Sequence, residues 1–191
     1  SVVKIIKFAS DISAEKAKKV ELESLLNAIN RSQAVIEFDV QGNILTANTN
    51  FLDTMGYQLN EINGRHHSMF ISKEYSNSLD YKKFWKKLGE GEFDSGQYKR
   101  MGKNGREVWI QASYNPIFDA KGRTVKVVKF ATDITEDVIR NSDYSSQIKA
   151  IDKSQAVIEF DLKGKILTAN DNFLQTLGYT LDEIKGLHHS M

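Results

Sequence analysis

The sequence predicts an α+β fold in which a five-stranded antiparallel sheet is interrupted by one group of short helices. Two short β-type runs come first, then apolar residues at helical spacing, then three longer runs rich in aromatic and β-branched residues. Turn sequences separate neighbouring runs, which favours antiparallel pairing of adjacent strands. Part of this pattern occurs twice, so the predicted fold is that of one domain in a tandem array.

An internal repeat defines the expected domains. Residues 32–69 and 154–191 are identical at 28 of 38 positions, and the offset between the copies is 122. Solenoid units are roughly 20–50 residues long, so this period indicates an array of small domains instead. The sequence thus predicts the last strand of a preceding copy (1–13), a linker helix (14–31), a complete domain (32–135), a second linker helix (136–153) and the N-terminal half of a following copy (154–191).

The complete domain is expected to begin with a β-hairpin. Residues 34–39 and 44–48 are short β-type runs, and Gly42 between them tolerates the positive φ of a tight turn. Asn48 or Asn50 can then cap a short helix.

The crossover is expected to contain further short helices. Gly56 and Gly64 end two helical pieces, and residues 65–77 show no clear periodicity. Apolar spacing from Ser78 to Leu88 then predicts an amphipathic helix.

Three longer strands are expected to complete the sheet, at 93–101, 106–118 and 123–132. Pro116 falls late in the second of them, where a bulge or a strand edge would accommodate its missing N–H donor.

The first linker carries an apolar stripe at helical spacing. We expect this stripe to favour a homodimer, whereas the second linker is more polar. The stripe consists of Val20, Leu22, Leu25, Leu26 and Ile29.

Composition and missing motifs reduce the number of possible partners and activities. The formal net charge is +1, from 26 basic and 25 acidic residues, so nothing indicates a nucleic-acid or membrane partner. The chain has no cysteine, no apolar run long enough to span a membrane and no signal peptide, which together favour a cytoplasmic module. It also lacks a nucleophile elbow, a P-loop and a dinucleotide-binding glycine motif, so no enzymatic activity is expected.

Two phrases and the element order point to a family. The phrases are KNGREVWIQASYNPIFDAKGR and the closing DIT of residues 133–135. Together with the order of strands and helices, they resemble a PAS sensory domain with its C-terminal PAC segment. The wording is similar to the PAS pairs of bacterial methyl-accepting chemotaxis proteins, in particular the tandem-PAS transducers linked to biofilm dispersion.

The resemblance implies a cavity for a small ligand or cofactor between the sheet and the short helices. It also implies that a signal leaves through the last strand into the helix after Ile134. Asp133 or Thr135 can fix the start of that helix, and Asp11 holds the same place in the preceding copy. Chemotaxis signalling proteins would then be reached through an output domain outside this chain.

His66 and His67 are candidate haem ligands. Histidine commonly binds haem iron, and haem-binding PAS domains take their axial histidine from the crossover. Adjacent histidines point in different directions, so at most one would face the cavity, with Met69 as a candidate second ligand. The structural alternative is that one histidine bonds the crossover backbone and the other is solvated.

Non-covalent FAD is the second cofactor candidate. The stretch from Gly56 to Phe70 is similar in spacing to the photoactive-cysteine region of light-oxygen-voltage domains, but His67 takes the place of the cysteine, which excludes a cysteinyl–flavin adduct. Alternatively, the two tryptophans are ordinary packing residues. Side chains that could contact a flavin ring are Trp85, Tyr98, Trp109, Gln111 and Asn115.

Two classes of function therefore stay open. The domain is either a sensor holding haem b, FAD or a small ligand, or a cofactor-free module for dimerisation or docking. The basic run 82–87 is interpreted as the solvated face of a helix. We also expect strand 1–10, which lacks its own domain, to pair with the sheet edge of a neighbour.

Overall fold

The structure of the chain is a computed structural model that describes residue 3 and residues 11–190. The expected strand over 1–13, and its pairing with a sheet edge, fall almost wholly outside these described residues. The chain divides into two compact units, residues 1–135 and 136–191.

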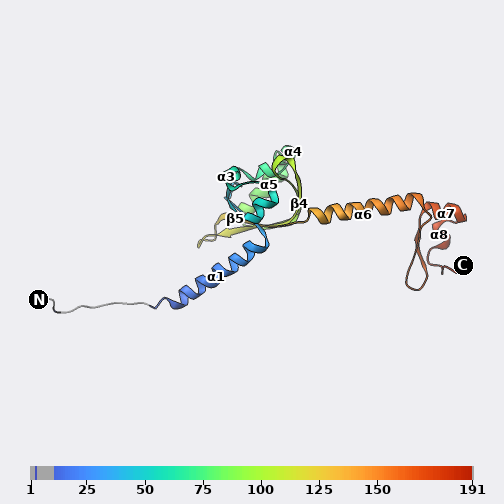
Figure 1. The fold of residues 1–191 in the computed structure, drawn as a ribbon, viewed down its shortest axis with the longest axis horizontal. Coiled ribbons are helices and arrows are strands. Elements are labelled where there is room, and N and C mark those ends of the chain that lie inside the picture. The colour runs from blue at the N-terminus through green and yellow to red at the C-terminus, as the bar shows by residue number, and fades with distance from the viewer. Residues whose placement is uncertain (1–2, 4–10, 191) are drawn as a thin grey trace. The chain divides into compact units, whose positions relative to one another are not determined.

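The first unit contains the predicted five-stranded antiparallel sheet (Figure 1). The strands lie in the order β2-β1-β5-β4-β3, so the last strand in the sequence occupies the centre. This order confirms the predicted fold, because the final strand lies beside the first. The strands are β1 (Ala34–Phe38), β2 (Ile44–Ala47), β3 (Asp94–Met101), β4 (Glu107–Phe118) and β5 (Thr124–Asp133).

Short helices between β2 and β3 gather on one face of this sheet (Figure 1). Asn48 caps the first of them, because its side-chain oxygen accepts the N–H of Phe51 at 2.9 Å. That helix ends at Gly56, which has φ 76°. The elements are α2 (Thr49–Met55), α3 (Leu59–Ile62), the 3-10 turn η1 (His67–Phe70), α4 (Lys73–Ser76) and α5 (Leu79–Gly89); the 3-10 turn η2 (Lys103–Gly105) joins β3 to β4.

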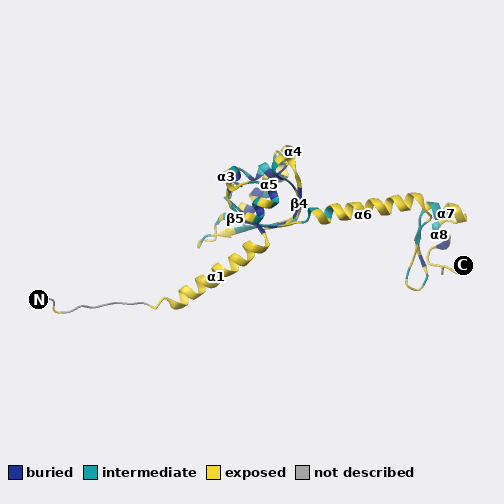
Figure 2. Cartoon of the chain, in the orientation of Figure 1, coloured by how far each residue is buried: buried dark blue, intermediate teal, exposed yellow. Residues whose placement is uncertain are grey.

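The core lies between the helices and the inward face of the sheet (Figure 2). In β4, Val108, Ile110, Ala112 and Tyr114 are buried, while the residues between them are more exposed. Since side chains alternate across a strand, this alternation identifies the inward face of β4. Tyr81, Trp85 and Leu88 supply the buried face of α5.

Pro116 lies on a part of β4 that has only one neighbouring strand. The β3–β4 ladder ends with Asp94 opposite Tyr114, whereas β5 continues with Val127 opposite Pro116. The register also shifts between Ile117 and the next residue. The predicted edge or bulge is thus observed near the proline.

The linker helix α1 (Ser13–Ser32) has no buried residue (Figure 2). Its C-terminal end is held by two side-chain amides of the α2 cap. Asn48 donates to the carbonyl oxygens of Asn30 at 3.0 Å and Gln33 at 2.8 Å, and Asn50 donates to the same two oxygens. These four residues are called the asparagine clasp below. The clasp satisfies carbonyls that a helix end leaves without partners.

The second unit repeats the first hairpin and its helices. A clasp occurs here too: Asn170 and Asn172 donate to the carbonyls of Asp152 and Gln155 at the end of α6. The elements are α6 (Thr135–Ser154), which begins at the boundary between the units, then β6 (Ile158–Phe160), β7 (Ile166–Ala169), α7 (Asp171–Leu177) and α8 (Leu181–Ile184).

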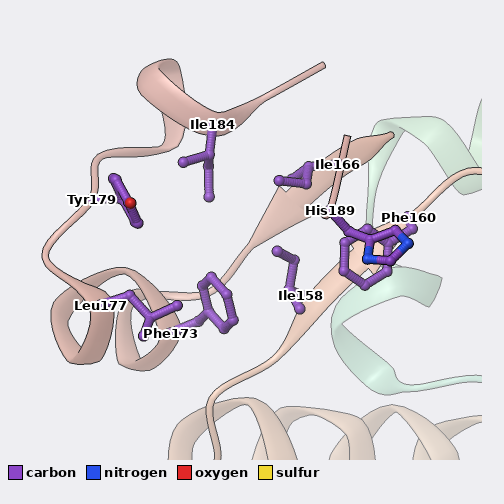
Figure 3. A pocket seen from close by; sticks show the side chains of 8 residues that line it. All are labelled: Ile158, Phe160, Ile166, Phe173, Leu177, Tyr179, Ile184 and His189. Atoms are coloured by element: carbon purple, nitrogen blue, oxygen red, sulfur yellow. The ribbon is translucent and has the colours of Figure 1, made fainter. Parts of the chain in front are cut away.

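An apolar pocket of about 190 Å³ opens between the β6–β7 hairpin and its helices (Figure 3). Each lining residue corresponds, at the offset of 122, to a position of the first unit that β3, β4, β5 and α5 help to cover. The pocket is therefore the uncovered counterpart of a core, and we do not regard it as a ligand site. Its lining residues are Ile158, Phe160, Ile166, Phe173, Leu177, Tyr179, Ile184 and His189.

Candidate functional site

The β1–β2 hairpin positions the two histidines. Gly42, at φ 92°, carries no side chain, and a Cβ there would lie 2.8 Å from both the His66 ring and the Trp85 ring. Glycine thus allows the turn to approach the crossover. His66 bonds the carbonyl of Gln41 through Nε2 at 2.9 Å, and its Nδ1 accepts the N–H of Ser68. His66 therefore has a structural role in joining the hairpin to η1.

His67, in contrast, is fully buried and bonds two tyrosines. Its Nδ1 lies 2.9 Å from the Tyr81 hydroxyl and its Nε2 lies 3.0 Å from the Tyr114 hydroxyl. Burial lowers the pKa of His67 well below 6.5, and the charges of Lys129 and Arg100 lower it further. The imidazole is therefore neutral, with one ring nitrogen donating and the other accepting.

Aromatic rings fill the space around the His67 imidazole. The nearest is Phe38, whose ring centroid lies 5.4 Å away, and the Tyr81 ring stacks at 5.8 Å. Because both ring nitrogens are already bonded and the surroundings are packed, this arrangement does not fit a haem with His67 as its iron ligand. The six surrounding rings are Phe38, Phe70, Tyr81, Phe84, Trp85 and Tyr114.

The candidate flavin contacts are divided between the two faces of the sheet. Trp85 packs against Phe38 in the core at 5.4 Å, whereas Trp109, Gln111 and Asn115 alternate with the buried positions of β4 and lie on the outward face. A single flavin ring cannot contact both sets. The expectation that these residues form one cofactor site is therefore corrected. Met69 and Tyr98 are partly buried against the core.

Two buried cations extend the His67 network. Arg100 donates from Nη2 to the Tyr114 hydroxyl at 3.1 Å, and the Lys129 ammonium lies 4.9 Å from the centroid of the Tyr114 ring. Their exposed fractions are only 5% and 1%. Tyr114 thus contacts His67, Arg100 and Lys129 at once.

The burial of these two cations was not predictable from the alternation of apolar residues. Both faces of β5 carry apolar residues, Val127 and Val128 among them, so the alternation did not indicate which face Lys129 occupies. The sequence did contain one indication of a buried cation, namely Lys129 within a largely apolar strand.

The proposed relay residues lie where β5 meets α6. The backbone N–H of Trp109 donates to the Thr135 hydroxyl at 2.9 Å, and its carbonyl accepts the N–H of Ile134 at 2.8 Å. Asp133 accepts the N–H of Thr135 at 2.9 Å. Asp11 does the same for Ser13 at 2.8 Å before α1. The start of α6 is therefore bonded to β4 as well as continuous with β5.

Three further features of the described part of the chain bear on membranes, metal ions and the basic run. No helix there is both long and apolar enough to cross a membrane. No group of three or more His, Asp or Glu side chains is placed to share a metal ion within residues 11–190. The lysines of the run 82–87 are exposed, as expected for a solvated helix face, while Trp85 is buried.

Comparison with known families agrees with this architecture. A family profile described as "PAS fold" matches residues 44–131, and one described as "PAS domain" matches residues 154–190. Among solved structures, the PAS domain of a protein from Colwellia psychrerythraea aligns with a TM-score of 0.53 at 20% identity, over 61% of this chain and 98% of that chain. This likeness concerns the fold alone.

Two curated proteins are similar in sequence. Biofilm dispersion protein BdlA of Pseudomonas aeruginosa is 46% identical over 162 residues, which cover 85% of this chain and 39% of BdlA. The aerotaxis receptor of Escherichia coli is 30% identical over 101 residues, 53% of this chain and 20% of the receptor. The chain thus spans less than half of either relative. The strand order, both profile matches and these similarities lead to one conclusion: the chain belongs to the PAS-domain family.

Proposed function

We propose that this chain is a cytoplasmic sensory and relay module of a chemotaxis-type transducer. In this proposal the first unit responds to a small ligand or a redox signal in its interior, and α6 carries the response onward without catalysis. The names of the relatives, a biofilm dispersion protein and an aerotaxis receptor, support a signalling role.

The observation that carries the proposal is the pair of hydrogen bonds between the backbone of Trp109 and the start of α6. Tyr114 lies on the same strand and contacts His67 and Arg100 in the interior. A change in the interior that shifts β4 would therefore also move the backbone groups that hold Ile134 and Thr135.

The test removes the Thr135 hydroxyl with Thr135→Val, which keeps the shape of the side chain. The hydroxyl accepts the N–H of Trp109 and donates to Asp133, so two hydrogen bonds are lost. At about 1 kcal/mol each, their loss should accelerate amide exchange in the first turn of α6 by up to about thirtyfold. In the full-length transducer, coupling of stimulus to kinase output should weaken. Thr132→Val is the control, because Thr132 is exposed on β5 and its side chain forms no hydrogen bond within the described residues. Equal output from both variants would contradict a relay through this contact.

A second candidate function is a cofactor-free dimerisation module. The specific observation in its favour is the apolar stripe of α1, whose members are between 38% and 60% exposed in the single chain. Such a stripe is typical of a helix that packs against a partner helix. Self-association and sensing are compatible, since a relay helix often works within a dimer.

A further inference from the structure

Lys129 is a buried cation without a carboxylate partner. It lies on the central strand β5, between Ile36 of β1 and Tyr114 of β4. Its ammonium is placed over the Tyr114 ring, and no salt bridge within residues 11–190 includes it. Burial and the charge of Arg100 lower its pKa well below 10.5. An isolated buried charge is costly, so this position reduces the stability of the domain.

Arg100 has unused hydrogen-bond donors. Its Nη1 donates to the carbonyl of Lys99 at 2.9 Å, its Nη2 donates to Tyr114, and its guanidinium lies 4.6 Å from the centroid of the Tyr98 ring. A guanidinium has five N–H donors. The buried Nε has no partner among the described residues. Nη1 and Nη2 each carry a second N–H, so the guanidinium can donate to an anion without losing its present bonds.

The carboxylate on the inward face of β3 does not neutralise these cations. Asp94 lies on the same strand as Arg100, but it accepts the Tyr98 hydroxyl at 2.5 Å and forms no salt bridge within the described part of the chain. At the rim, Lys99 and Glu107 pair with each other at 2.5 Å. The interior of the first unit is thus left with an excess of positive charge.

A pocket of about 450 Å³ leads to Arg100 from the surface. Two of the charged lining residues, Lys99 and Glu107, neutralise each other as an ion pair, which leaves Arg100 as the unpaired charge of the wall. Apolar side chains beside a planar guanidinium suit an organic acid better than a strongly hydrated inorganic ion. The lining residues are Ile71, Ser72, Tyr75, Lys99, Arg100, Met101 and Glu107. The pocket lies between β3 and the segment from η1 to α4, so an occupant would touch both the sheet and the crossover.

We propose that Arg100 binds the carboxylate of a small organic acid in this pocket, and that Lys129 supports the anion electrostatically from across the Tyr114 ring. This inference rests on the proposed sensory function and assigns a chemical class to the ligand. The anion would offset the repulsion between the two cations, so binding would stabilise the same network that includes His67 and β4.

The test measures the melting temperature of the 191-residue chain with benzoate, with neutral benzamide of the same shape, and with inorganic phosphate. Benzoate at tenfold its dissociation constant should raise Tm by about 3–5 °C, while benzamide should not. The shift should disappear in Arg100→Met and shrink in Lys129→Met. Lys82→Met is the matched control, because it removes an exposed lysine of α5 that does not line this pocket, so the shift should remain. Without benzoate, Lys129→Met should melt above the wild type, since it removes the unpaired buried charge.

Several results would overturn the proposal. Equal benzoate shifts in all four proteins would indicate a nonspecific salt effect, and stabilisation by phosphate but not benzoate would exclude the carboxylate class. A Lys129→Met protein that melts below the wild type would make the lysine structural. Failure of the sensory function is distinguishable: benzoate would then bind as expected, but Thr135→Val would leave transducer output unchanged.

Discussion

Single residues in the interior of the first unit determine how it responds to protons. His67 is buried between two tyrosine hydroxyls, and burial raises the pKa of Tyr81 to about 12 and raises that of Tyr114 as well. Both tyrosines therefore keep their protons at neutral pH. His67 stays neutral because its surroundings contain positive charge and exclude water.

We expect the free energy of unfolding to fall as pH decreases below about 6.5. The unfolded chain binds a proton at this imidazole in that range, whereas folded His67, with its lowered pKa, does not. Urea unfolding of the wild type and of His67→Gln, from pH 7.5 to pH 5, measures the effect. The variant should be less stable at pH 7.5, by about 1–3 kcal/mol, but should lose less stability on acidification. The remaining histidines are common to both proteins, so parallel pH profiles would contradict the assignment to His67.

The partners of His67 show why residue-scale details were not predictable. Tyr81 and Tyr114 lie 14 and 47 residues away, so no local spacing links them to the histidine. The sequence did indicate that at most one of the two histidines faces the interior. It could not place Trp109 and Gln111, because a strand with apolar side chains on both faces does not identify its inward face.

Elements were more predictable than contacts, because their signals are local. The backbone turns at Gly42 and Gly56, where φ is positive, and α2 is capped by the side chain of Asn48. Each of these effects acts within a few residues, so the hairpin and α2 lie where the sequence predicts them. The apolar spacing of 78–88 similarly anticipated α5, which spans Leu79–Gly89. The crossover segment 65–77 had no periodicity, and it forms the 3-10 turn η1 followed by the short helix α4.

We expect Leu25→Asp in α1 to weaken self-association of the chain. Leu25 is 57% exposed within the apolar stripe, and a carboxylate there would lose its hydration in a helix–helix interface. Sedimentation equilibrium should show a dissociation constant raised at least tenfold. Asn27→Asp is the control, since it adds the same charge about 160° around the helix from both Leu25 and Ile29. An unchanged mass distribution for Leu25→Asp would remove α1 from the interface.

At the scale of the whole molecule, the repeat places nearly the same hairpin in two environments. In the first unit Phe38 is fully buried, whereas its counterpart Phe160 is 43% exposed. Neighbouring sequence is almost unchanged, so the difference arises from the strands and the helix that cover the first copy. Most of the stability of such a hairpin comes from that covering layer.

We therefore expect amide hydrogens of β6 and β7 to exchange at least 100-fold faster than those of β1 and β2 in the 191-residue chain. Intrinsic exchange rates are matched by the shared sequence, so each copy serves as the control for the other. Hydrogen exchange followed by mass spectrometry measures both copies in one experiment. Comparable protection would show that another segment, or a second chain, covers the apolar pocket of the second unit.

The asparagine clasp of the first unit has a further consequence, because one amide of that clasp joins three elements. The Asn48 side-chain oxygen accepts the N–H groups of Val35 and Phe51, and its nitrogen donates to the carbonyl oxygens of Asn30 and Gln33. Aspartate has the same shape and keeps both acceptors, but it places an oxygen where the two donors were, against carbonyl oxygens. Asn48→Asp would therefore keep the cap of α2 and release the end of α1. Exchanging one nitrogen for one oxygen would thus uncouple the linker helix while leaving the fold of the domain intact.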